Sequence, residues 1–106
     1  MQRMMKQAQK MAADLQRAQE ELAEREFEGS AGGGAVHAVV SGDQHVKTVT
    51  IDPEIFEGEP DSDDIEMLAD TVTAAVNDAL AKARDAQQQV LGPLSGGLGG
   101  MGLPGA

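Results

Sequence analysis

The stretch from Phe27 to Asp52, FEGSAGGGAVHAVVSGDQHVKTVTID, decides the fold because its apolar residues follow an alternating rather than a helical period. In its central run, apolar residues occupy every second position, at Val36, Ala38 and Val40, and His37 and Val39 lie between them. The residues on either side, AGGG at 31–34 and Gly42-Asp43, are typical of tight turns. β-Branched residues then dominate residues 45–51. The pattern predicts two or three short antiparallel strands.

A sheet of this size is marginally stable alone and needs a helix or a second subunit against it. Residues 2–26 supply the first helix, because apolar residues recur there at alternating steps of 4 and 3, the heptad pattern. No Gly or Pro interrupts this segment. We call its apolar row the apolar seam, and its members are Met4, Ala8, Met11, Leu15, Ala18 and Leu22. The seam predicts a packing surface, whether its partner lies in the same chain or in another.

A second helix follows the strands. Asp52-Pro53-Glu54 ends the last strand, residues 56–60 form a loop, and Asp61 or Ser62 caps the helix. Acidic residues in the first turn of this helix interact favourably with the helix dipole. The expected apolar face consists of Ile65, Leu68, Val72, Val76, Ala79, Leu80 and Ala83. Gly92-Pro93 is expected to end this helix. The prediction is an α+β fold of order α-β-β-β-α, with a domain over residues 1–91 and a Gly-rich disordered tail over 92–106.

The composition points to association between chains. At 106 residues the chain is one domain, and Phe27 and Phe56 are its only aromatic residues. It has no cysteine, which excludes disulfides and thiolate zinc sites. A core this small is usually supplemented by oligomerisation, so we expect a dimer. No stretch approaches the roughly 20 apolar residues of a membrane span, and no signal peptide is evident. We therefore expect a soluble, cytoplasmic protein that does not bind membranes.

Positive charge is concentrated at one end of the chain. The formal net charge is −10, yet four of the eight Lys and Arg residues lie in the first 17 positions, with Asp14 as the only acid. Residues 18–81 hold 16 of the 18 acidic residues against two basic ones. On a helical wheel the four cations lie opposite the apolar seam, in a row roughly 21 Å long. We call this row the basic stripe, and its members are Arg3, Lys6, Lys10 and Arg17.

The basic stripe has two interpretations. It is either a solvated face that keeps a Met-rich helix soluble or a surface for a polyanion. Segregation from an acidic body favours the second interpretation. Cations along one face contact successive phosphates and give affinity that is independent of sequence. The stripe contains no aromatic residue on which single-stranded bases stack, so contacts to the duplex backbone are expected.

Other residues with chemical potential form no diagnostic pattern. His37 and His45 lie near the two ends of a hairpin and face one another in some registers, but their spacing identifies no metal site. The glycine run 32–34 is not followed by the Gly-Lys-Ser/Thr of a phosphate-binding loop. The acidic run 57–64 lacks the calcium-loop pattern. No nucleophile lies in an elbow or triad pattern. We expect no enzyme activity, no cofactor, no metal and no small-molecule substrate.

Four motifs in order resemble those of the YbaB/EbfC nucleoid-associated proteins. They are MKQAQKM at 5–11, GSAGGG at 29–34, IDPE at 51–54 and AAVNDA at 74–79. The resemblance runs from about residue 4 to residue 91, and the Gly-rich tail is also similar.

The resemblance implies a bacterial homodimer whose strands join across the dimer and whose helices project like tweezer arms that grip double-stranded DNA. It also implies a change in DNA conformation and a role in nucleoid organisation or gene regulation. By this likeness Arg3, Lys6, Lys10 and Arg17 lie on the DNA-gripping arm. The alternative is a non-enzymatic module that docks another protein through the Met-rich face of the first helix.

Overall fold

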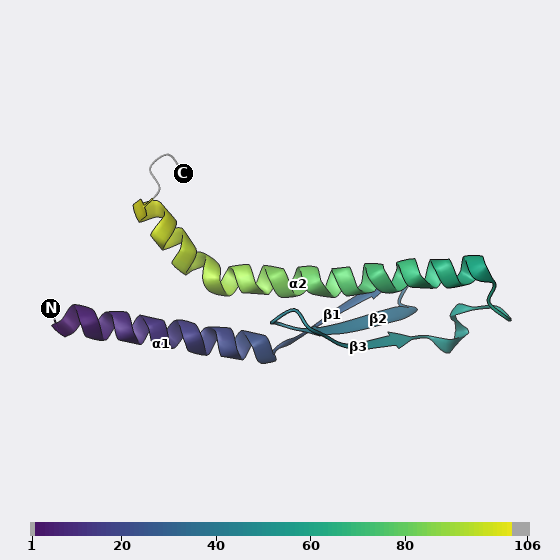
Figure 1. Ribbon diagram of the computed structural model, residues 1–106, viewed down its shortest axis with the longest axis horizontal. Coiled ribbons are helices and arrows are strands. Elements are labelled where there is room, and N and C mark those ends of the chain that lie inside the picture. The colour runs from purple at the N-terminus through teal and green to yellow at the C-terminus, as the bar shows by residue number, and fades with distance from the viewer. Residues whose placement is uncertain (1, 103–106) are drawn as a thin grey trace.

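The computed structural model describes residues 2–102, except for the side chains of residues 91 and 93–102. Its elements are α1 (Gln2–Glu24), β1 (Glu26–Ala31), β2 (Val36–Ser41), β3 (Val46–Ile51), the 3₁₀ turn η1 (Pro53–Ile55) and α2 (Ser62–Gly102). Figure 1 shows the strands stacked on α2, with α1 leaving one end of the sheet. The α+β class and the order α-β-β-β-α predicted from the sequence are confirmed. The first helix ends two residues before the expected position.

The three strands form one antiparallel sheet in the order β1-β2-β3. In the turn between β1 and β2, Gly32, Gly33 and Gly34 all have positive φ angles, between 66° and 92°. Glycine adopts this backbone conformation without a steric penalty, which explains the run of three. The register pairs Val36 with Ile51 and Ala38 with Val49, and an irregularity follows near Val40. The alternation read from the sequence is thus the alternation of the sheet's two faces.

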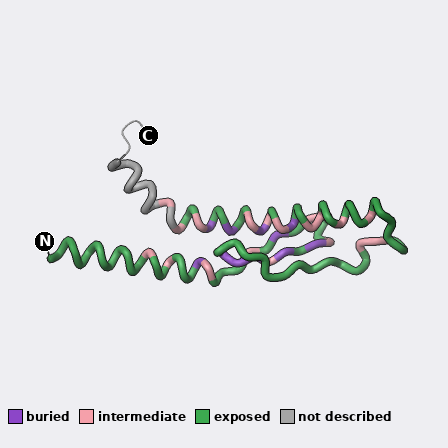
Figure 2. The backbone as a smooth tube through the Cα atoms, viewed as in Figure 1, coloured by how far each residue is buried: buried purple, intermediate pink, exposed green. Residues whose placement is uncertain are grey.

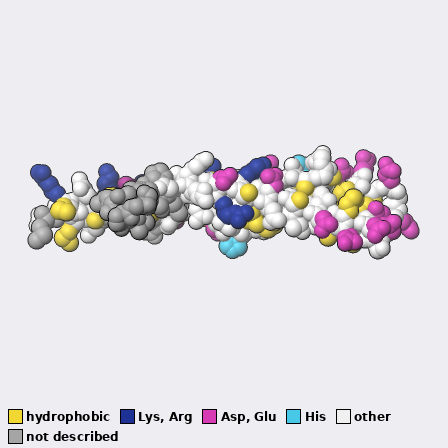
Figure 3. All heavy atoms as spheres, turned by 90° about the horizontal axis from the view of Figure 1, so that it is seen from above, with side chains coloured by type: hydrophobic (Ala, Val, Ile, Leu, Met, Phe, Trp, Pro, Cys, Tyr) yellow, Lys and Arg dark blue, Asp and Glu magenta, His cyan; other side chains and the backbone are white. Residues whose placement is uncertain are grey.

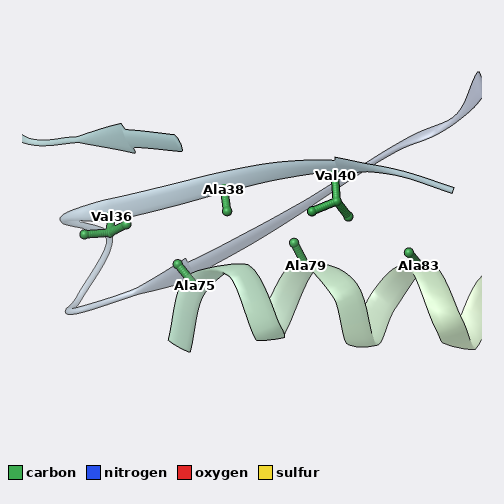
Figure 4. Packing of buried hydrophobic residues seen from close by; sticks show 6 residues of the cluster. All are labelled: Val36, Ala38, Val40, Ala75, Ala79 and Ala83. Carbon is green, nitrogen blue, oxygen red and sulfur yellow. The ribbon is translucent and has the colours of Figure 1, made fainter. Parts of the chain in front are cut away.

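α2 lies across β1 and β2 and barely reaches β3. Figure 4 shows the apolar side chains of β2 pointing at the helix, where three alanines meet them. These six residues, Val36, Ala38, Val40, Ala75, Ala79 and Ala83, are fully buried. The larger residues expected on this face, such as Leu68 and Leu80, are only partly buried at its edges. The helix therefore packs through its small residues, which brings its axis close to the sheet.

Gly29 on β1 completes this close approach. A Cβ atom at Gly29 would overlap the backbone of Ala75 and Ala79 on α2. An isolated glycine within a strand is typical of places where another backbone comes near. The contact explains why α2 presents alanine rather than leucine to β1.

The start of α2 is confirmed, and its end is not. Asp61 caps the helix, because its carboxylate accepts a hydrogen bond from the Asp64 N–H at 2.8 Å. The Asp64 carboxylate in turn accepts from the Asp61 N–H at 3.1 Å, which closes a capping box. The expected stop at Gly92-Pro93 is wrong, since α2 continues to Gly102. Proline kinks a helix as well as ending one, and Figure 1 shows α2 bending in its C-terminal part. Residues 103–106 of the expected tail lie outside the described residues.

The molecule is strongly elongated. Its extents are 72 × 32 × 17 Å and its radius of gyration is 20.3 Å, against about 13 Å for a compact domain of similar length. α2 runs along most of the long axis, and α1 lengthens the molecule further, because it leaves the end of the sheet and meets the rest of the chain only over its C-terminal half, where it contacts α2 and β2. In Figure 2 most of α1 is exposed, whereas burial is concentrated where α2 meets the sheet. We call α1 the arm and the sheet with α2 the body.

Candidate nucleic-acid interface

All four cations of the basic stripe lie on the arm and are exposed. At 3.6 residues per turn they fall within an arc of about 60°, and the centre of the apolar seam lies about 130° away. The structure therefore brings together the residues that the charge pattern singled out. The arm offers one cationic face and one apolar face over most of its length.

The cations of the arm differ from those of the body in their partners. Within residues 2–102 the ion pairs join Lys47 to Glu26, Lys82 to Asp78 and His45 to Asp43. Lys82 also donates to the Glu28 carbonyl oxygen at 2.8 Å, and the Arg25 guanidinium lies 5.0 Å from the centre of the Phe27 ring. None of these interactions uses a cation of the basic stripe. Its charges therefore remain available to an external anion.

The charges on the arm oppose its own helix dipole. The first turn of α1 holds no acidic residue, and its last turn holds no basic residue. Arg3 lies instead at the positive end of the helix, and Glu24 is its last residue, at the negative end. Each such placement costs a helix roughly 0.3–1 kcal/mol. A stripe that only kept the helix soluble would not need this arrangement. An anion bound near the N-terminus of α1 would offset this cost, because the cations and the helix dipole would both attract the anion.

The stripe has a definite end. Glu21 and Glu24 lie on the same side of α1 as the basic stripe but closer to the body. Figure 3 shows cations near the N-terminal end of the molecule and acidic side chains gathered at the opposite end, around the start of α2. A polyanion is therefore attracted to the outer two thirds of the arm and repelled by the body.

The outer half of the apolar seam is exposed in the single chain, and its inner half is partly or fully buried. Met4 is 73% exposed and Met11 58%, whereas Leu22 alone among α1 residues is buried. A second exposed apolar row lies on β3, where Val46, Val49 and Ile51 are each at least 39% exposed. Their register places this row on the same face of the sheet as the buried side chains of β2. The outer half of the seam and the β3 row are therefore left uncovered within the described part of the chain.

The histidines do not form a site together. His37 pairs with Thr50 in mid-sheet, whereas His45 lies in the turn between β2 and β3. In that turn the Ser41 hydroxyl and the His45 ring donate hydrogen bonds to Asp43. These bonds, that from Ser41 most of all, lower the pKa of the Asp43 carboxyl group. No group of three or more potential metal ligands occurs among the described residues. Helices in that part of the chain are also too short or too polar to cross a bilayer.

Comparison with known proteins identifies the family. The family model for the YbaB/EbfC DNA-binding family matches residues 1–98. The chain belongs to that family. A nucleoid-associated protein of Saccharopolyspora erythraea is 52% identical over 99% of this chain and 92% of its own length. A nucleoid-associated protein of Streptomyces avermitilis is also 52% identical, with coverage of 99% and 89%. One from Acetivibrio thermocellus is 49% identical, with coverage of 92% and 83%.

A solved structure has the same fold as this chain. The crystal structure of an uncharacterized protein from Helicobacter pylori superposes with a TM-score of 0.61 over 78% of this chain and 92% of that one. The two sequences are only 17% identical, so this likeness concerns the fold alone. The resemblance drawn from the four motifs is thus confirmed at the level of family and fold.

The residues that hold the arm to the body have no distinct signal in the sequence. The pattern alone places Gly42 in a tight turn and Leu22 in the apolar seam. In the structure both are buried and lie against each other. A turn glycine that follows a strand carries no distinguishing signal by itself, since the contact joins segments some 20 residues apart.

Proposed function

We propose that this protein binds duplex DNA as a homodimer through the basic stripe of each arm. The observation that carries the proposal is a row of four exposed cations, unpaired within the described residues, on a helix that projects from an acidic body. Family membership supports DNA as the polyanion. The arms contact phosphates, and the body is held away from the duplex by its own charge.

This mode of binding is largely independent of DNA sequence. Two arms contribute about four to eight phosphate contacts, which gives a slope of log K against log salt of roughly −4 to −7. Only the two arginines of the stripe suit bidentate reading of a base edge. Two rigid arms that grip one duplex also favour a particular DNA shape, which is how such binding alters DNA conformation. The resulting role is nucleoid organisation or gene regulation in the bacterial cytoplasm, without catalysis.

The homodimer follows from what the single chain leaves uncovered. Among the described side chains, the largest fully buried ones are Val36 and Val40, and most other core residues are alanine. Such a core is small for a stable domain. The β3 row and the outer apolar seam are the surfaces that a second copy would cover. Burying them would extend the core past the edge of α2 and remove an open strand edge.

The test is DNA binding by a variant in which Arg3, Lys6, Lys10 and Arg17 are all replaced by alanine. Fluorescence anisotropy with a labelled duplex at several salt concentrations measures both affinity and salt slope. We expect the variant to lose most of its affinity and nearly all of its salt dependence. Light scattering checks that the dimer remains, since these positions lie away from the apolar seam.

The chain offers a charge-matched control. Its other four cations are Arg25, Lys47, Lys82 and Arg84. Replacing these by alanine changes the net charge by the same amount but leaves the stripe intact, so DNA binding should persist. If both quadruple variants lose affinity equally, net charge rather than the stripe controls binding. If the stripe variant binds as wild type does, the contact surface lies elsewhere.

Exposed Met4, Met5 and Met11 favour one alternative, a module that docks a different protein through the Met-rich face. Methionine-rich surfaces adapt to several partners. Wild-type protein with no DNA affinity even at low salt, together with a monomeric state, would favour that alternative.

A further inference from the structure

The arm meets the body only over its C-terminal half, where α1 contacts α2 and the end of β2. Leu22, on the last turn of α1, is 5% exposed and is the only buried residue of that helix. It lies against the turn between β2 and β3, residues 42–45, which we call the docking turn. Residues of α1, the docking turn and α2 line one hollow there, among them Ala23, Asp43 and Gln87. The direction of the whole arm therefore depends on this junction.

Gly42 makes the junction possible. The Gly42 N–H donates to the Arg25 carbonyl oxygen at 3.0 Å, and the Arg25 N–H donates to the Leu22 carbonyl oxygen at 3.1 Å. A Cβ atom at Gly42 would overlap that same Leu22 carbonyl group. The φ angle of Gly42 is not positive, unlike those of the glycines in the β1–β2 turn. Glycine is required at this position because of the close approach of α1 and not because of the turn conformation.

Several hydrogen bonds hold the docking turn in place. The Ser41 hydroxyl donates to the Asp43 carboxylate and accepts from the His45 N–H at 3.2 Å. The His45 Nδ1 atom lies 3.1 Å from the same carboxylate. On the other side, the Gln44 side-chain amide donates to the Gln87 side chain of α2 at 3.1 Å. The turn thus connects the last turn of the arm to the helix of the body.

We propose that Gly42 is a positioning residue that sets the angle at which α1 leaves the body. From Leu22 to Arg3 the helix extends roughly 28 Å, so a tilt of about 10° moves the outer cations by about 5 Å. Neighbouring phosphates of one strand are separated by about 3.4 Å along the duplex axis. A tilt of that size therefore shifts the basic stripe out of register with the phosphates. The structural part of this proposal stands alone, and only its effect on DNA rests on the proposed function.

The test measures the arm angle directly and without DNA. Because the chain has no cysteine, single cysteines at the exposed positions Gln9 on α1 and Thr73 on α2 accept spin labels. Mixing with excess unlabelled protein restricts each dimer to one labelled chain. Double electron–electron resonance then gives the distance from arm to body. For Gly42→Ala we expect a distance shifted by about 5 Å or a clearly broadened distribution, and DNA affinity reduced about tenfold.

Two further variants make the result interpretable. Gly33→Ala is the matched control, since a Cβ there meets nothing within 4 Å, and although its positive φ makes alanine costly, the arm distance should not change. Leu22→Ala removes the side chain that α1 packs against Gly42 and should broaden the distribution of arm-to-body distances. This variant tests the junction if Gly42→Ala does not fold.

The outcomes separate this proposal from the proposed function. An unchanged arm distance in the folded variants overturns the role of Gly42, whatever happens to DNA affinity. A changed distance with unchanged DNA affinity supports the positioning role and counts against the arm as the DNA contact.

Discussion

The first turn of α2 carries Asp63 and Asp64, where the helix dipole favours them, whereas the first turn of α1 carries Arg3 and no acid. The same contrast extends to burial and to charge pairing. α2 buries its alanines against the sheet, and Lys82 has partners within the chain. The outer arm buries almost nothing, and its cations are unpaired within the described residues.

The comparison indicates that the two regions satisfy different requirements. The body is arranged for its own stability, through helix capping, small-residue packing and local ion pairs. On the proposed function, the arm gives up helix stability for a surface that binds DNA. Each of the following changes to the chain affects one region and should leave the other unchanged.

The largest effect is expected in the body, at Gly29. Gly29→Ala places a methyl group into the backbone of α2 at Ala75 and Ala79, and neither strand nor helix can move without opening the core. We expect the free energy of unfolding to fall by about 3 kcal/mol, at the upper end for overpacking. Chemical denaturation measures it. Gly33→Ala, at φ +68° in open space, should cost only about 1–2 kcal/mol. Equal losses at both positions would mean that close packing of α2 on β1 is not decisive.

How far the sequence anticipates the fold depends on the range of each interaction. Strands and turns were predicted because alternation and glycine turns are local signals. The close packing of α2 on the sheet is not predicted, because hydrophobic periodicity favours Leu68 and Leu80 over alanine as buried residues. The buried residues are instead decided by Gly29, which lies on a strand distant in the sequence. The basic stripe was found from charge segregation alone. Its junction at Leu22 and Gly42 was not, because that contact exists only once α1 and the docking turn meet.

The next effect concerns the open face of β3. Val49 shares the face of the buried Ala38, whereas Thr50 shares the face of His37. If a second copy covers the β3 row, Val49→Lys places a charge in an apolar interface, and dimer dissociation should increase at least tenfold. Analytical ultracentrifugation measures the dissociation constant. Thr50→Lys, on the other face of the same strand, is the control and should leave association nearly unchanged.

A wild-type protein that is monomeric at micromolar concentration would overturn this prediction. So would a melting temperature that does not rise with protein concentration, because association stabilises the folded state by mass action.

A smaller effect is expected on removing residues 92–106. This segment is rich in glycine, which is about 1 kcal/mol less favourable than alanine per helical position. Its sequence offers little periodic apolar surface for packing, so its helical turns add little to the stability of the whole chain. Truncation after Leu91 should therefore change the unfolding free energy by less than about 1 kcal/mol, as measured by thermal denaturation. A larger loss would show that the C-terminal part of α2 packs on the rest of the protein.

The smallest change in stability, and the most specific to the arm, is expected for Arg3→Glu. An acidic residue in the first turn of α1 interacts favourably with the helix dipole, so the free protein should gain about 0.3–1 kcal/mol. DNA affinity should fall, because a cation at the end of the stripe becomes an anion. Circular dichroism during thermal unfolding and anisotropy with a labelled duplex measure the two quantities on one sample.

Lys10→Glu, in the middle of the same stripe and away from the helix end, is the matched control: it should lose DNA affinity without the gain in stability. A gain in stability together with a loss of DNA affinity for Arg3→Glu would mean that Arg3 binds a polyanion at the expense of helix stability. A simultaneous loss of stability and affinity would mean that Arg3 supports the fold, and the contrast between arm and body would then not extend to the first turn.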